Sequence, residues 1–144
     1  MANRNLYLVF AAGLVVILSI SAACLGCNTT TDTPSPPGAP DLASIPLADV
    51  LTNGRPTLAE FGWRTCIPCK KMKPILEELA VEYGAKLDVV IVEVYEHSDL
   101  TDQYGITLIP TQIIFDGTGV EATRHIGFWP KEEIIAQLEN MGVL

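Results

Sequence analysis

The chain has 144 residues, which is enough for one ordinary domain and too few for two. Its formal net charge is −8, and all but one of the acidic residues lie after residue 40. An acidic domain has no electrostatic attraction for nucleic acid, so the composition argues against a nucleic-acid-binding protein.

The first predicted element is an apolar run from Leu6 to Gly26 that holds no charged residue and follows Arg4. At about 1.5 Å per residue, such a run forms a helix about 30 Å long, enough to span a bilayer. A short basic segment followed by an apolar core is typical of an export signal. Residues 1–27 therefore predict a cleaved signal peptide, an uncleaved membrane anchor or a lipoprotein signal, and the sequence leaves all three open.

The end of this run, Ile20-Ser21-Ala22-Ala23-Cys24, resembles a bacterial lipobox, although Ser21 stands where leucine is usual. Cys24 is therefore the predicted lipidation site. The alternative is that Cys24 and Cys27 are simply small apolar residues at the end of a membrane helix. All three interpretations place the rest of the chain outside the cytoplasm, in the periplasm or at the cell surface, because Arg4 favours keeping the short flank inside.

Residues 28–44 are rich in Thr, Pro, Ser and Ala and show no apolar period. Such a composition cannot bury enough surface to offset chain entropy, so it predicts a flexible linker. The globular pattern begins at Ile45, and residues 45–144 are the predicted domain.

Within this domain the apolar pattern alternates between helices and strands. The predicted elements in chain order are a short helix at 47–54, a buried strand at 57–63, a long helix from Cys66 to Gly84 with a kink before Pro74, a strand at 86–95, a short helix at 98–104 capped by Ser98, two hairpin strands at 112–115 and 120–126, and a last helix after Pro130. This order predicts an α/β fold with a central mixed sheet and helices on both faces.

Cys66 and Cys69 stand where the long helix begins, in the segment WRTCIPCKK. A lone C-x-x-C is compatible with half a zinc site, a structural disulfide or a redox centre. His97 and His125 are the histidines that would have to complete a metal site. Structural zinc needs four ligands, and neither histidine is brought obviously onto Cys66, so no metal is predicted.

Residues 45–144 resemble the thioredoxin family. The segment AEFGWRTCIPCK is similar to the family's strand, C-x-P-C-K and helix, and Ile109-Pro110-Thr111 resembles its cis-proline loop. The 41 positions from Cys69 to Pro110 equal the spacing in short bacterial members, and Gly127 falls near the family's glycine after the last strand. The resemblance implies a thioredoxin fold and a thiol–disulfide oxidoreductase that acts on protein disulfides without an organic cofactor.

The resemblance also assigns roles at the cysteine pair, which would form the redox-active disulfide Cys66–Cys69. Cys66 would attack the substrate, because a helix N-terminus offers unpaired N–H groups and a partial positive charge that lower a thiol pKa. Cys69 would resolve the mixed disulfide. Ile67 and Pro68 would form the active-site loop, where proline is tolerated at the start of a helix.

A carboxylate on the preceding strand is a further family feature, and the matching residue is Glu60. It would exchange a proton with Cys69 through water, unless it is a strand carboxylate paired with a lysine or facing solvent. The family's lysine near this position aligns with Ile91, so a lone buried glutamate should have a raised pKa.

The predicted substrate-binding residues are Ile109, Pro110 and Trp63. Pro110 would be cis, which leaves the Ile109 backbone to pair with an extended substrate. Trp63 replaces the family's tryptophan before the first cysteine. No histidine lies between the cysteines, which favours a reductant or exchange catalyst over an oxidase.

A reductase outside the cytoplasm works in an oxidising compartment and would need a thiol electron donor, either in the membrane or soluble. The alternative function is a non-catalytic metal-handling or binding module on the same fold.

Overall fold

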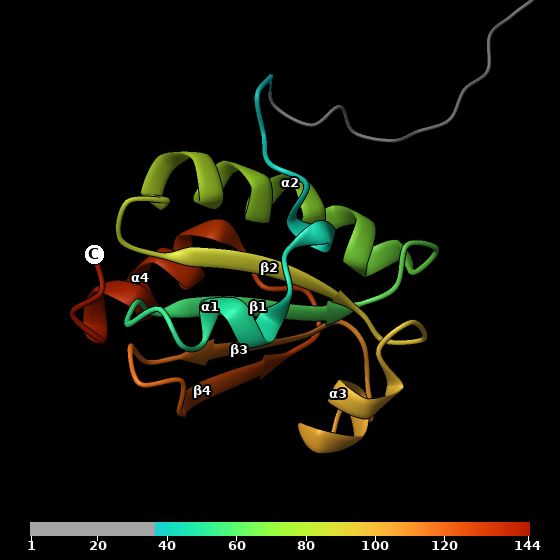
Figure 1. The fold of residues 1–144 in the computed structure, drawn as a ribbon. Coiled ribbons are helices and arrows are strands. Elements are labelled where there is room, and N and C mark those ends of the chain that lie inside the picture. The colour runs from blue at the N-terminus through green and yellow to red at the C-terminus, as the bar shows by residue number, and fades with distance from the viewer. Residues whose placement is uncertain (1–36) are drawn as a thin grey trace, which may run out of the picture. The chain divides into compact units, whose positions relative to one another are not determined.

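The computed structural model describes residues 37–144, which form a mixed sheet with helices on both of its faces (Figure 1). The elements are the 3-10 helix η1 (Leu42–Ser44), α1 (Leu47–Val50), β1 (Thr57–Gly62), α2 (Ile67–Tyr83), β2 (Asp88–Glu93), α3 (Ser98–Gln103), β3 (Thr111–Phe115), β4 (Glu121–Ile126) and α4 (Lys131–Asn140). The predicted signal or anchor at 1–27, with Cys24 and Cys27, lies outside the described residues. Across 37–144, no helix has both the length and the apolar character needed to cross a membrane.

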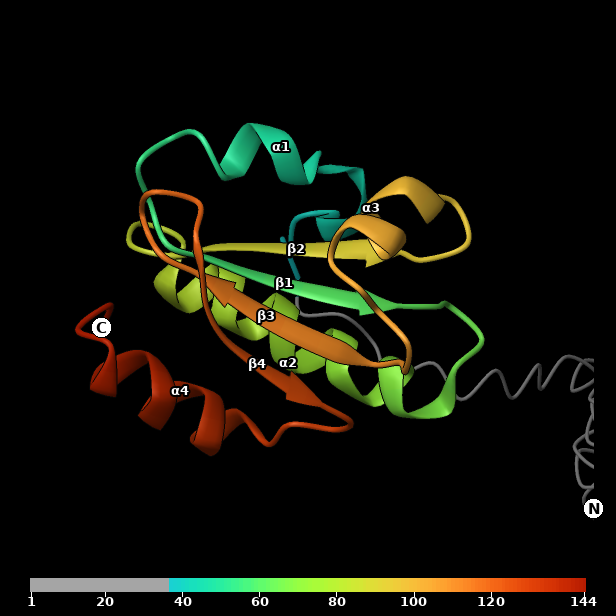
Figure 2. The ribbon, with the colours of Figure 1, turned by 90° about the horizontal axis from the view of Figure 1, so that it is seen from below.

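The sheet has the strand order β2-β1-β3-β4. Strand β1 is parallel to β2 and antiparallel to β3, and β3 and β4 form the predicted hairpin. Figure 2 shows α1 and α3 on one side of the sheet and α2 and α4 on the other. The predicted mixed sheet with helices on both faces is therefore confirmed.

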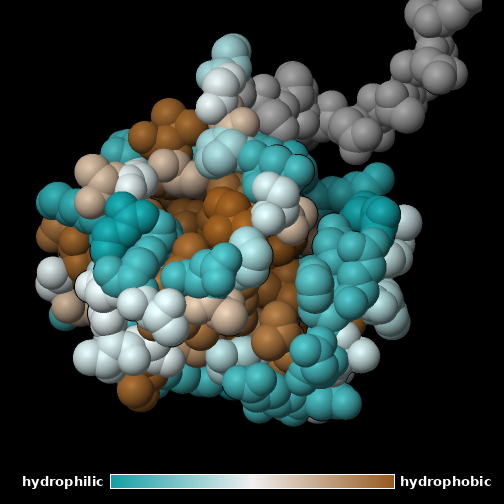
Figure 3. Space-filling model, viewed as in Figure 1, coloured by the Kyte–Doolittle hydropathy of each residue, from teal (hydrophilic) through white to brown (hydrophobic). Residues whose placement is uncertain are grey.

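Two apolar clusters hold these layers together, because successive side chains of a strand point to opposite faces. On the α2/α4 face, Leu58 of β1 and Ile114 of β3 pack with residues of both helices, among them Met72 and Leu138. On the α1/α3 face the cluster contains only apolar residues, which are Leu47, Val50, Ala59, Phe61, Val90, Val92, Val94, Ile113 and Phe115. All six positions of β1 are buried, as predicted for a strand covered on both faces. In the view of Figure 3, apolar surface lies in the middle of the face and hydrophilic residues surround it.

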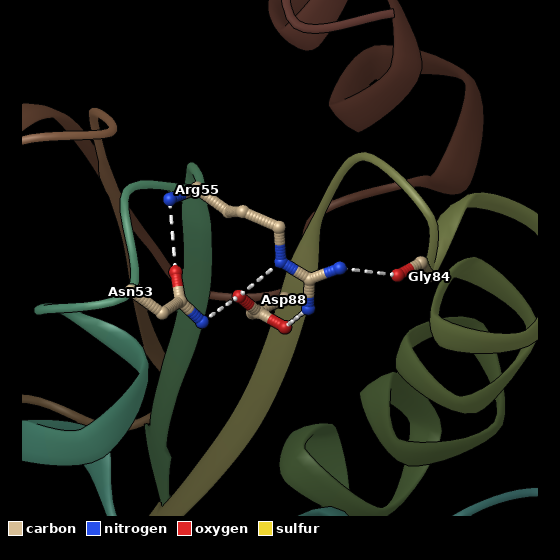
Figure 4. A network of polar contacts seen from close by, with 4 residues as sticks. All are labelled: Asn53, Arg55, Gly84 and Asp88. Carbon is tan, nitrogen blue, oxygen red and sulfur yellow. Dashed lines mark hydrogen bonds and ion pairs between the residues drawn. The ribbon is translucent and has the colours of Figure 1, made fainter.

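The end of the sheet where β1 and β2 begin carries a closed polar network (Figure 4). The Arg55 guanidinium binds the Asp88 carboxylate, with an Nε–Oδ2 distance of 3.0 Å, and donates to the Gly84 carbonyl at 2.8 Å. The Asn53 amide donates to Asp88 at 2.8 Å and accepts the Arg55 backbone N–H at 2.8 Å. This network joins the start of β1 to the end of α2 and the start of β2.

Several element boundaries differ from the predictions: the strand predicted at 86–95 is shorter, Leu42–Ser44 of the predicted linker form η1, and α1 and α3 differ in their ends. Helix α1 ends at Val50 rather than near Gly54, because the chain leaves it through a turn in which Gly54 adopts a φ of 85°. Ser98 is not a cap but the first residue of α3. The Thr101 N–H donates to the His97 carbonyl at 3.0 Å, which makes His97 the capping residue. Helix α2 continues through Pro74.

Candidate active site

Cys66 is the N-cap of α2, as the C-x-x-C pattern predicts. Its backbone is extended (φ −71°, ψ 122°), and its Sγ accepts the Cys69 backbone N–H at 3.4 Å. The sulfur therefore lies where the unpaired N–H groups of a helix stabilise a thiolate. Both cysteines are free thiols; Cys66 is half-buried and Cys69 is buried. The pair thus has one accessible and one sheltered thiol, in the dithiol form.

Cys69 is held as a neutral thiol. Burial raises its pKa to about 12, and the contact with Cys66 adds to the rise. A thiol of this kind is not ionised at neutral pH, so its use as a nucleophile requires a base nearby.

Glu60 is the carboxyl that faces this thiol. Its side chain is 1% exposed, and its Oε1 has no hydrogen-bond partner among the described residues. Burial raises its pKa to about 8, and the negative charge of Glu93 contributes. Its cross-strand neighbour on β2 is Ile91, an apolar side chain that offers the carboxyl no positive charge. The predicted rise in the pKa of a lone buried glutamate is confirmed.

Gly62 lies between Glu60 and Cys69, a position that was not predicted from the sequence. A Cβ at this position would lie 3.2 Å from Glu60 Oε1 and 3.3 Å from Cys69 Sγ, closer than side-chain carbons usually approach. The carboxyl and the thiol therefore rest against the same piece of backbone. A glycine inside a strand pattern is the available signal, because it often marks such a close approach.

The Ile109-Pro110 peptide bond is cis, as predicted. Thr111 pairs with Phe61, so this loop lies at the end of the sheet where β1 runs into the cysteine loop. Its geometry is fixed by the Pro110 carbonyl, which accepts the Gly127 N–H at 2.8 Å, and by the Thr111 hydroxyl, which donates to the Leu108 carbonyl at 2.8 Å. The apolar residues Ile67, Leu108, Ile126 and Phe128 are exposed.

Trp63 is half-buried in a stack of aromatic and charged groups. Its ring meets Tyr95 edge-on at 4.9 Å, and the Arg64 guanidinium lies 4.4 Å from its centroid. Arg64 also forms ion pairs with Glu93 and Glu96. The stack joins the ends of β1 and β2, and the role of Trp63 in substrate binding stays a prediction.

The surroundings of the two histidines do not resemble a metal site. His97 is exposed at the start of α3, and the His125 ring stacks on Trp129 with a centroid distance of 4.7 Å. Within residues 37–144, no three His, Cys, Asp or Glu side chains are arranged to hold a metal ion.

An accessible thiol on a helix N-terminus with a buried thiol behind it is suited to dithiol–disulfide exchange. The sequence profile described as Thioredoxin matches residues 47–140. Thioredoxin from Alicyclobacillus acidocaldarius is 40% identical over 91 residues, covering 63% of this chain and 86% of that protein. Thioredoxin from Pseudomonas aeruginosa is 36% identical over 91 residues, covering 63% and 83%. Among solved structures, a mutant thioredoxin from Halobacterium salinarum has a TM-score of 0.61 at 26% identity and covers 65% of this chain and 80% of its own.

The chain belongs to the thioredoxin family. It is a thiol–disulfide oxidoreductase with a redox-active cysteine pair, Cys66 and Cys69.

Proposed function

We propose that this protein is a protein-disulfide reductase that works outside the cytoplasm on a membrane tether. The observation that carries the catalytic part is the unequal pair, with Cys66 on the N-terminus of α2 and Cys69 buried behind it. The location is supported by the uncharged run from Leu6 to Gly26 and by the lipobox-like sequence before Cys24, followed by the linker at 28–44.

In the proposed reaction, the Cys66 thiolate attacks one sulfur of a substrate disulfide, and the other substrate sulfur leaves as a thiol after taking a proton from solvent. Cys69 then gives its proton to Glu60, and its thiolate attacks Cys66 Sγ. This step forms the Cys66–Cys69 disulfide and releases the second substrate sulfur as a thiolate, which takes a proton from solvent. Two electrons have passed to the substrate, and a thiol donor, in the membrane or soluble, restores the dithiol.

Glu60 is suited to both directions of this proton transfer. With a pKa of about 8 it is mostly a neutral acid at pH 7, able to protonate Cys69 when the disulfide is reduced. Its basic form grows as the pH rises, so resolution of the mixed disulfide should accelerate up to about pH 8. Gly62 leaves the two groups in contact with the same backbone.

We infer the direction of electron flow from how weakly a thiolate at Cys69 is stabilised. Strong oxidants in this class stabilise the reduced form through a thiolate of low pKa. Here burial raises the pKa of Cys69 to about 12, and the residues between the cysteines are Ile67 and Pro68, neither of which carries a charge. These features favour a reductant or exchange catalyst.

Reduction of insulin with dithiothreitol as donor tests the catalytic proposal. We expect turnover by the wild type, none by Cys66→Ser, and a trapped mixed disulfide without turnover in Cys69→Ser. If the wild type were as inactive as Cys66→Ser, the proposed enzymatic activity would be wrong. If the wild type bound one metal ion per chain and Cys66→Ser bound none, the metal-handling alternative would be favoured. A redox potential of about −120 mV, measured by equilibration with glutathione, would make it an oxidase instead.

The location has its own test. We expect the protein to fractionate with membranes, to be digested by protease added from outside the cytoplasmic membrane, and to carry a lipid that Cys24→Ser removes. Membrane association without lipid would point to an anchor. A protease-protected protein in the cytosolic fraction would overturn the proposed location.

A further inference from the structure

Three polar side chains form a row across the sheet beside the active site. In the antiparallel pairs, Gln112 of β3 lies directly opposite Glu60, and His125 of β4 lies directly opposite Gln112. Directly opposite residues point to the same face, with Cβ atoms about 5 Å apart. Glu60, Gln112 and His125 thus lie on the α2/α4 face, and we call them the polar row.

Gln112 has no structural reason to be polar. Its side chain is 0% exposed, and neither Oε1 nor Nε2 has a hydrogen-bond partner among the described residues. Its neighbour in the row, Glu60, has an unpaired Oε1 as well. Leaving buried polar atoms unpaired costs stability, and leucine has a similar volume and no such cost. Buried polar groups of this kind are ordinarily satisfied by ordered water.

The row extends across the sheet from beside the buried thiol to the partly exposed strand β4. At one end, Glu60 and Cys69 meet at Gly62. At the other end, His125 is half-buried, its ring stacked on Trp129, with Nε2 3.3 Å from the Phe128 carbonyl. An imidazole has two ring nitrogens, so it can take up a proton at one and release a proton from the other.

Among the described contacts, the titratable or charged groups beside the row lie at the Glu60 end. They are Cys66 and Cys69 from α2, Glu93 from β2, and Arg64, which pairs with Glu93. On the β2 side the row is closed by Ile91, which cannot carry a proton. At the His125 end the contacts are a ring and a carbonyl, both uncharged. Glu93 is therefore the competing exit for a proton on Glu60.

We propose that the polar row is the proton path of the exchange reaction, in which water held by Gln112 links Glu60 to His125. The proposal rests on the proposed role of Glu60. The S–H bond of Cys69 breaks and an O–H bond forms on Glu60. The proton then moves through water to a ring nitrogen of His125 and on to solvent, and no electron moves with it. Gln112 is a positioning residue that neither gains nor loses a proton.

Gln112→Leu separates this role from a structural one. We expect unchanged or higher thermal stability, an unchanged rate of Cys66 attack, and release of the substrate from its mixed disulfide slowed about tenfold. Both rates come from rapid-quench single-turnover experiments. The matched control is Gln103→Leu at an exposed position of α3, which should leave both rates unchanged. Equal slowing of both steps with lost stability would mean that Gln112 is only structural.

His125 allows chemical rescue. In His125→Ala, the release step should slow about tenfold and recover when free imidazole is added, whereas imidazole should not rescue Gln112→Leu. His125→Phe should keep the ring stacked on Trp129 and remain slow. The proposal would be overturned if both His125 variants released substrate at the wild-type rate while Glu93→Gln released it slowly. The proton would then leave Glu60 along β2.

The proposed role of Glu60 and the polar row can fail separately. If Glu60→Gln releases substrate at the wild-type rate, the role of Glu60 itself is wrong. If Glu60→Gln is slow while the Gln112 and His125 variants match the wild type, Glu60 keeps its role and the polar row is wrong.

Discussion

The two ends of the sheet treat their charged and amide side chains in opposite ways, although the buried Thr57 hydroxyl at the start of β1 also has no partner among the described residues. Where β1 and β2 begin, Asn53, Arg55 and Asp88 satisfy one another and the Gly84 carbonyl (Figure 4). Toward the redox end of the same strands, Glu60 Oε1 and both polar atoms of Gln112 have no partner among the described residues, although both side chains are more deeply buried.

The difference shows that the domain is less stabilised by hydrogen bonds near its reactive cysteines. A satisfied network fixes the chain and needs no further explanation. An unsatisfied one destabilises the fold, and here it adjoins Cys69, whose reaction needs a base out of contact with bulk water. The comparison therefore predicts opposite results for substitutions at the two ends: stability changes at one and activity at the other.

The largest effect should come from Glu60→Gln. We expect release from the mixed disulfide to slow about 100-fold, because the base is lost. The folded-state pKa of about 8 lies above the usual glutamate pKa of 4.5, so between these values the folded protein binds the extra proton and stability falls as the pH rises. Glu60→Gln should abolish this fall, which is at most about 1.4 kcal/mol per pH unit.

Single-turnover kinetics and urea unfolding at several pH values from 5 to 8 would measure both effects. Glu78→Gln, at an exposed position of α2, is the matched control. A wild-type pH slope retained in Glu60→Gln would contradict the account.

At the other end, Asp88→Ala should cost stability and spare activity. It removes the hydrogen bonds from Arg55 and Asn53, and we expect a loss of about 2 kcal/mol in the free energy of unfolding. Urea denaturation and insulin reduction measure the two properties, with Asp102→Ala at an exposed site as the control. If Asp88→Ala lowered the activity of each folded molecule, the claim that this end of the sheet affects only stability would be wrong.

The smallest effect is expected from Gly62→Ala, which adds a Cβ close to both Glu60 and Cys69. We expect a loss of about 1 kcal/mol in stability, as for mild overpacking, and a few-fold slower release. In the Glu60→Gln background, the same substitution should slow release no further, because the interaction that it disturbs is already gone. Full additivity of the two rate effects would show that Gly62 acts elsewhere.

Much of the fold and the cysteine site could be predicted from local patterns. The strand before Cys66, the helix after it and the spacing to Pro110 are local or motif features, and the structure places them as predicted. The polar row could not be predicted, because it depends on which residue of β3 pairs with Glu60. Gln112 appears in the sequence as one polar residue in an apolar strand, and only the register makes it a neighbour of the active site.

The most direct test is to titrate the Glu60 carboxyl carbon by NMR in the reduced protein, with the resonance assigned by its loss in Glu60→Gln. The account predicts a midpoint near pH 8, produced by burial and by Glu93. A midpoint near the usual glutamate value of 4.5 would show an ionised, solvated carboxylate and would contradict the central claim that burial beside Cys69 brings the pKa of Glu60 close to neutral pH.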